Sequence, residues 1–71
     1  MKNKRILFAW NTKWISFGTY EDAKQYALDS RNKGNMVDTE REDVDVFGVI
    51  PDGDRFLVIV HQRISGYNPG W

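Results

Sequence analysis

The sequence predicts a small α+β domain in which a single amphipathic helix packs on a four- to five-stranded, mainly antiparallel sheet. Three observations carry this prediction: a capped helical segment at about residues 20–33, two apolar segments with strand periodicity before it, and an almost unbroken apolar run at residues 56–60. The expected order of elements is β-β-α-(β)-β-β. One domain is expected over residues 1–71, with an irregular tail at about 64–71.

The two segments that precede the helix both alternate in hydrophobicity. Residues 4–10 and 13–17 place large apolar side chains at every second position, which is the period of a half-buried strand. The polar pair Asn11 and Thr12 separates them and predicts a tight hairpin turn. Trp10 shares the period-two pattern of its segment, and such aromatics are typical of a core, so Trp10 is expected to be buried.

The helix is the most strongly marked element. Thr19 is a favourable N-cap residue, and Asp22 follows three positions later, as in a capping box. Ala23 and Ala27 lie on one face and allow a close approach to a sheet. Gly34 is suited to the left-handed position that ends many helices.

The second half of the sequence predicts the remaining strands. Met36 and Val37 are expected to start a short strand, followed by a charged loop at residues 39–43 and a strand within residues 44–50. Residues 51–54, Pro-Asp-Gly-Asp, form a strong turn signal. The apolar run at residues 56–60 is expected to be the central and most buried strand.

Size and composition bound the class of protein. A chain of 71 residues with 41% hydrophobic residues is near the lower limit for one unaided core, so association with a second copy is a possible source of added burial. The chain contains no cysteine, which excludes disulfides and thiolate sites and favours a cytoplasmic setting. No segment is long and apolar enough for a transmembrane helix, and no membrane partner is expected.

The charge is zero overall but unevenly distributed. Residues 1–37 carry seven Lys and Arg against three acidic residues, and residues 38–71 carry three against seven. The basic half leaves a nucleic-acid-binding module as the alternative function, because basic residues beside aromatics suit backbone contact and base stacking. The residues that would serve it are Lys2, Lys4, Arg5 and Lys13.

Catalytic and metal chemistry find little support. His61 is the single histidine and ends a predicted strand, where a surface role is commonest; an enzyme would need it close to a carboxylate in a pocket. The acidic residues between 38 and 45 lack the spacing of a calcium-binding loop. We therefore expect a protein that is not an enzyme and that binds no cofactor or metal.

Protein binding is the favoured function. Apolar residues occupy both faces of the predicted sheet, whereas one helix covers one face, so a surplus apolar surface is expected to dock on a larger protein or on a second copy. The acidic loop could add contacts to a basic groove. The residues expected to bind the partner are Trp14, Tyr67, Trp71, Glu40, Glu42 and Asp43.

The general pattern resembles small phage-encoded accessory proteins, including some CRISPR inhibitors. The resemblance is architectural: a very short chain without cysteine, a capped helix at residues 19–27 between strands, and a late Asp-Gly hairpin followed by a tail that contains Gly66, Gly70 and Trp71. It carries no diagnostic residues, so it transfers no site. The resemblance implies an inhibitor or host-takeover factor that acts by docking on a host macromolecule.

Overall fold

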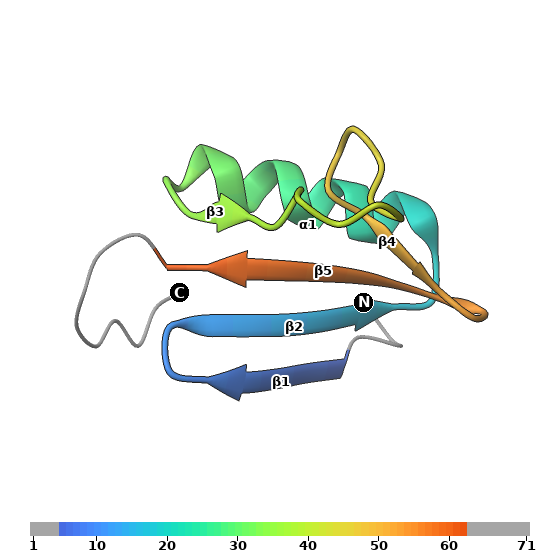
Figure 1. Ribbon diagram of the computed structural model, residues 1–71, viewed down its shortest axis with the longest axis horizontal. Helices are drawn as coiled ribbons and strands as arrows, with labels where there is room; N and C mark the ends of the chain where they lie inside the picture. The colour runs from blue at the N-terminus through green and yellow to red at the C-terminus, as the bar shows by residue number, and fades with distance from the viewer. Residues whose placement is uncertain (1–4, 63–71) are drawn as a thin grey trace.

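The computed structural model describes residues 5–62, and in them one helix packs on a five-stranded antiparallel sheet (Figure 1). This confirms the predicted α+β class and element order. The elements are β1 (Arg5–Ala9), β2 (Thr12–Phe17), α1 (Tyr20–Asn32), β3 (Met36–Val37), β4 (Ile50–Asp52) and β5 (Arg55–His61).

Strand β5 is the centre of the sheet. Along one side it pairs antiparallel with β2, in a register that runs from Thr12 opposite His61 to Phe17 opposite Phe56. Along its other side it pairs with β4 near its start and with β3 near its end. Strand β1 lies beyond β2, so the order across the sheet is β1-β2-β5-β3. The predicted central position of this apolar strand is confirmed.

Local signals fix both ends of α1. The side-chain oxygen of Thr19 accepts a hydrogen bond from the backbone N–H of Asp22 at 3.3 Å. Gly34 has a φ of 90°, the left-handed conformation expected after a helix. The helix contacts β5, β3 and β2 but not β1. Within residues 5–62 no helix is long and apolar enough to cross a membrane.

The core lies between α1 and the helix-facing side of the sheet. Its sheet residues are Ile15 and Phe17 from β2 and Val58 and Val60 from β5, all fully buried. Ala23 and Ala27 of α1 pack against them, as the alanine face predicts, and Val37 and Val49 complete the cluster. Because alanine has a short side chain, the helix axis can lie close to the strands.

The segment before β4 differs from the prediction. A strand was expected within residues 44–50, but only Ile50 belongs to one, and residues 44–49 form a loop with a turn at residues 45–48. The carboxylate of Asp45 explains the difference, because its Oδ1 accepts hydrogen bonds from the N–H groups of Phe47 (2.9 Å) and Val49 (3.0 Å). These bonds offer the backbone an alternative to a strand ladder.

The first hairpin turn lies one residue earlier than predicted. Ala9 pairs with Thr12, so the two turn residues are Trp10 and Asn11 rather than Asn11 and Thr12. This placement lets the backbone oxygen of Asn11 accept a hydrogen bond from the N–H of Gln62 at 2.8 Å. The prediction that Trp10 is buried is therefore wrong: its side chain is 98% exposed.

Candidate functional site

Four strands present residues side by side at one end of the sheet. Ala9 of β1, Thr12 of β2, His61 of β5 and Met36 of β3 form one row across it, because each is paired in register with the next. The β1–β2 turn lies at this same end (Figure 1). We call this surface the hairpin end, and it consists of Trp10, Asn11, Thr12, Met36 and His61.

Trp10 occupies a turn position that ordinarily selects glycine. Its φ is 59°, and it is the single non-glycine residue with a positive φ in the part of the chain that the structure describes. The second hairpin has the same two-residue design, and there Gly53 occupies the equivalent first position with a φ of 64°. A residue with a Cβ atom is about 1–2 kcal/mol less stable than glycine in this conformation. The chain thus carries a large indole at a strained position and exposes nearly all of it.

Replacing Trp10 with glycine is expected to stabilise the protein by about 0.5–1 kcal/mol. The relief of backbone strain outweighs the extra entropy that glycine gives the unfolded chain, and the exposed indole loses no packing. Urea denaturation followed by circular dichroism measures the change. Ala9→Gly is the matched control, because it adds the same entropy on the neighbouring strand without relieving strain, and it is expected to destabilise. Equal stability of the two variants would contradict the strain at Trp10.

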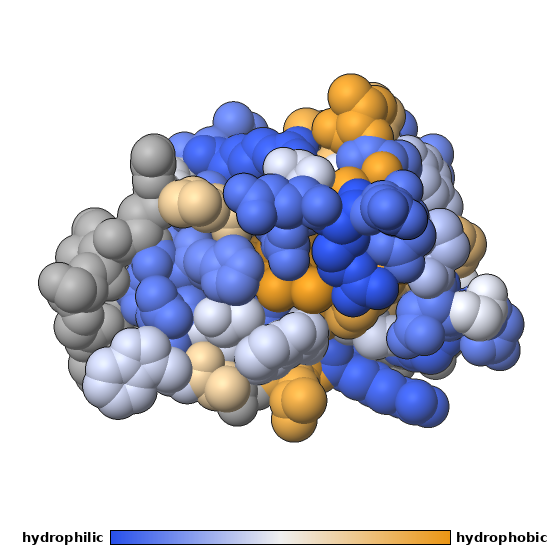
Figure 2. All heavy atoms as spheres, viewed as in Figure 1, coloured by the Kyte–Doolittle hydropathy of each residue, from blue (hydrophilic) through white to orange (hydrophobic). Residues whose placement is uncertain are grey.

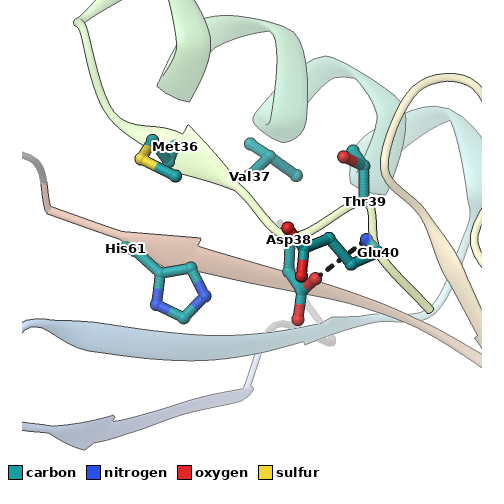
Figure 3. A pocket seen from close by; sticks show the side chains of 6 residues that line it. All are labelled: Met36, Val37, Asp38, Thr39, Glu40 and His61. Carbon is teal, nitrogen blue, oxygen red and sulfur yellow. Dashed lines mark hydrogen bonds between the residues drawn. The ribbon is translucent and has the colours of Figure 1, made fainter.

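A small cavity lies at the other side of the hairpin end, where β3 continues into the acidic loop. It has a volume of about 240 Å³ and is lined by Met36, Val37, Asp38, Thr39, Glu40 and His61 (Figure 3). The backbone N–H of Glu40 donates to Oδ1 of Asp38 at 3.1 Å, which holds the two acidic residues in one turn. The cavity is smaller than most small-molecule sites.

The imidazole of His61 is oriented by β2. Its Nδ1 lies 2.9 Å from Oγ1 of Thr12, whose hydroxyl also lies 3.4 Å from Oδ1 of Asn11. The cavity beside His61 and the nearby carboxylates of Asp38 and Glu40 meet part of what a histidine-dependent enzyme would require. Within residues 5–62, however, the hydrogen bond that His61 makes is to a hydroxyl and not to a carboxylate, so the arrangement of a base oriented by an acid is not formed.

The acidic loop, residues 38–45, contains both exposed and partly buried carboxylates. Glu40, Glu42 and Asp43 are exposed, as a partner-binding role requires. Asp43 already binds Arg41 of the same loop through two hydrogen bonds of 3.1 Å, which reduces the negative charge that it presents. Asp45 is partly buried and serves the fold instead.

Asp45 is coupled to Tyr20 at the start of α1. Partial burial acts to raise the pKa of the Asp45 carboxyl, but hydrogen bonds from the Tyr20 hydroxyl and from backbone N–H groups outweigh it, so the pKa lies below its usual value. The same hydrogen bond is the main cause that raises the pKa of Tyr20 to about 12. This pair ties the loop to the helix.

The structure places the sequence-predicted site residues in different environments. Trp14 is partly buried on the sheet face away from α1, between Leu7 and Ile59. That face exposes less apolar surface than expected, because Ile59 is also buried there. Tyr67 and Trp71 lie outside the described residues.

The nucleic-acid alternative loses one of its residues. Lys13 is only 4% exposed and its ammonium lies 5.6 Å from the centre of the Tyr26 ring, so it belongs to the core and not to a phosphate-binding surface. Its place on the helix-facing side of β2 explains the correction. Arg5 is exposed on β1. Lys2 and Lys4 lie outside the described residues.

Residues 5–62 contain no group of three or more His, Asp or Glu side chains placed to hold a metal ion. Comparisons with protein-family models, with curated proteins and with solved structures found no match. The functional interpretation therefore rests on the geometry of the hairpin end.

Proposed function

We propose that this chain is a non-enzymatic protein-binding module that docks on a larger partner through its hairpin end. The observation that carries the proposal is Trp10, which is 98% exposed at a strained position. Strain of this kind concentrates at functional sites, because a purely structural turn would gain stability from glycine. The exposed Trp10 therefore serves binding rather than the stability of the turn.

Tryptophan at the tip of a hairpin is a suitable anchor for a protein interface. A buried Trp side chain removes about 150–250 Å² from water, and Trp is enriched among the residues that dominate binding energy. The turn that holds Trp10 is fixed by β1 and β2 and by the bond between Asn11 and Gln62. Because the backbone at Trp10 is held in place before binding, little backbone entropy is lost when the indole enters a partner.

The cavity near Met36 defines the second half of the contact. Asp38 and Glu40 bring two carboxylates to it, and the exposed Met36 borders it. The row from Ala9 to Met36 crosses three interstrand spacings, or about 14 Å. A fitting partner would have an apolar slot for the indole and, roughly that far away, an Arg or Lys side chain for the cavity.

The charges at the hairpin end do not favour nucleic acid as the ligand of this surface. Two carboxylates would face a phosphate backbone, and Lys13 lies in the core. An inhibitor or host-takeover factor, as the resemblance to phage accessory proteins implies, would be one instance of a module that docks on a host protein.

The test is quantitative affinity capture from host lysate with the wild type and with Trp10→Gly. Loss of an interface anchor is expected to lower recovery of the true partner about 30-fold, while the fold is retained. Val46→Ser is the matched control: Val46 is also strongly exposed, at 82%, but lies in the loop before β4, away from the hairpin end. Recovery of every captured protein at wild-type levels with Trp10→Gly would refute the proposal.

The cavity is tested separately by the double variant Asp38→Asn and Glu40→Gln. It is expected to weaken the same interaction and to reduce its dependence on salt, since charge pairing is lost. If the salt dependence of binding were unchanged, the proposal that an Arg or Lys side chain of the partner binds in the cavity would be refuted.

A further inference from the structure

The outer edge of β1 is uncovered in the part of the chain that the structure describes. Strand β1 pairs with β2 on one side, and no described strand pairs with its other side. The helix does not reach over β1. Ile6 and Leu7 point to opposite faces and are 43% and 67% exposed. Figure 2 shows hydrophobic residues at the lower margin, over β1, as well as at the top over the loop before β4 and in the middle of this face.

The hairpin geometry determines which backbone groups of β1 point outward. In a two-residue hairpin the pair that flanks the turn is hydrogen-bonded, and hydrogen-bonded and non-bonded pairs then alternate. Here the flanking pair is Ala9 and Thr12. Arg5, Leu7 and Ala9 therefore direct their N–H and C=O groups toward β2, whereas Ile6 and residue 8 direct theirs to the free edge.

We propose that β1 pairs antiparallel with β1 of a second copy of this chain, about a two-fold axis at Leu7. In this register Leu7 lies opposite Leu7 of the second copy, and Ile6 lies opposite residue 8. Only Ile6 and residue 8 have outward backbone groups, and this register joins them in two hydrogen-bonded pairs. Leu7 has none free and falls at a non-bonded pair, where side chains approach most closely. Any register displaced by one residue on one copy would leave these groups unmatched.

The side chains of β1 suit pairing with themselves. The strand reads Arg-Ile-Leu-Phe-Ala, and its single charge, Arg5, lies opposite Ala9 of the second copy. No like charges oppose each other across the two-fold axis. Sheet edges are usually protected from such pairing by lysine, proline, a bulge or a covering element. Strand β1 has no lysine or proline within its five residues, and its one charged residue, Arg5, lies at its start.

The resulting dimer would join both sheets into one and place both helices on the same face. The two hairpin ends would then point in opposite directions. Their Trp10 residues would be about 20 Å apart along the strand direction, because six residues separate them in the register. The inference does not rest on the function proposed for Trp10, and Trp10→Gly is expected to leave the dimer intact.

Sedimentation equilibrium of the full chain tests the dimer. The expected mass is twice the 8.3 kDa of one chain, and it should fall toward 8.3 kDa on dilution. A mass of one chain at all concentrations up to about 1 mM, where even weak specific pairing is detectable, would overturn the proposal.

Charge variants at Leu7 test the register itself. Leu7→Lys places two lysines opposite each other and is expected to weaken dimerisation about 100-fold or more, and Leu7→Glu should do the same. An equimolar mixture of the two should restore a dimer, since lysine then opposes glutamate. Val46→Lys, which charges an exposed apolar residue elsewhere, is the control and should dimerise as the wild type does. A dimer that persists in Leu7→Lys, or that the mixture fails to restore, would overturn the pairing at Leu7.

Discussion

Replacing Gly48 with alanine is expected to destabilise the protein by about 2–4 kcal/mol, whereas the same replacement at Gly34 is expected to destabilise it by about 1 kcal/mol. The two glycines have nearly the same φ, at 89° for Gly48 and 90° for Gly34. At Gly34 an added Cβ would meet nothing within 4 Å, so conformational strain is the whole effect. At Gly48 the Cβ would lie 2.5 Å from Cγ1 of Val37 and 3.0 Å from Nη2 of Arg31.

The difference between these two variants isolates the close packing of the loop before β4 against β3. Val37 is buried in the core, so it can move away only by disturbing its neighbours. Urea denaturation of Gly34→Ala and Gly48→Ala, with the m-values compared, measures both changes. If the two variants were equally stable, the loop would not pack on Val37 as the structure shows.

Replacing Asp45 with alanine is expected to destabilise the protein by about 2–3 kcal/mol, because three donors lose a charged acceptor. They are the hydroxyl of Tyr20 and the N–H groups of Phe47 and Val49. Tyr20→Phe removes only the first of these bonds and serves as the matched partial variant, with a smaller expected loss. An exposed acid of the same loop, Glu42, provides the control, since Glu42→Ala should change stability little. A loss as small for Asp45 as for Glu42 would contradict the role of Asp45 in holding the loop.

The hydrogen-bonded pair of Asp45 and Tyr20 makes the free energy of unfolding depend on pH in both the acid and the alkaline range. The pKa of Asp45 is lower in the folded state than its ordinary value of 3.8, so its contribution is present above that value and is lost as the pH falls through the folded pKa. The pKa of Tyr20 is raised from 10.0 to about 12, so its contribution is present below pH 10 and is lost as the pH rises toward 12. In Asp45→Asn both dependences should diminish. If urea denaturation of this variant showed the same loss of stability at acid and at alkaline pH as the wild type, the coupling of Asp45 to Tyr20 would be contradicted.

The elements with local signals could be predicted from the sequence. Thr19 and Gly34 bound α1 because capping depends on neighbouring residues alone. The apolar run of β5 predicted a buried central strand because strands covered on both sides read as continuous apolar segments. Where one local signal opposed another, as with the carboxylate of Asp45 within an apparently strand-forming segment, the side-chain hydrogen bonds prevailed.

The register of the first hairpin could not be predicted in this way. A turn at Asn11 and Thr12 and a turn at Trp10 and Asn11 keep every apolar residue of both strands on the same face, so periodicity does not distinguish them. The choice is made by β5, because the earlier turn allows Thr12 to pair with His61 and Asn11 to bind Gln62. The exposed Trp10, and with it the candidate site, thus depends on a contact between distant parts of the chain.

The ribosome synthesises the central strand β5 long after its neighbour β2. Thr12 and His61 are 49 residues apart, and a ribosome adds that length in about 3–10 s. During that interval β1 and β2 can form a hairpin, but the strand that covers the other edge of β2 does not yet exist. We expect the nascent chain to hold the apolar residues of β2 exposed until residues 55–61 emerge. Native structure should therefore form only after residues 55–61 have left the ribosome, and a chain stalled before residue 55 should be a preferred client of ribosome-associated chaperones.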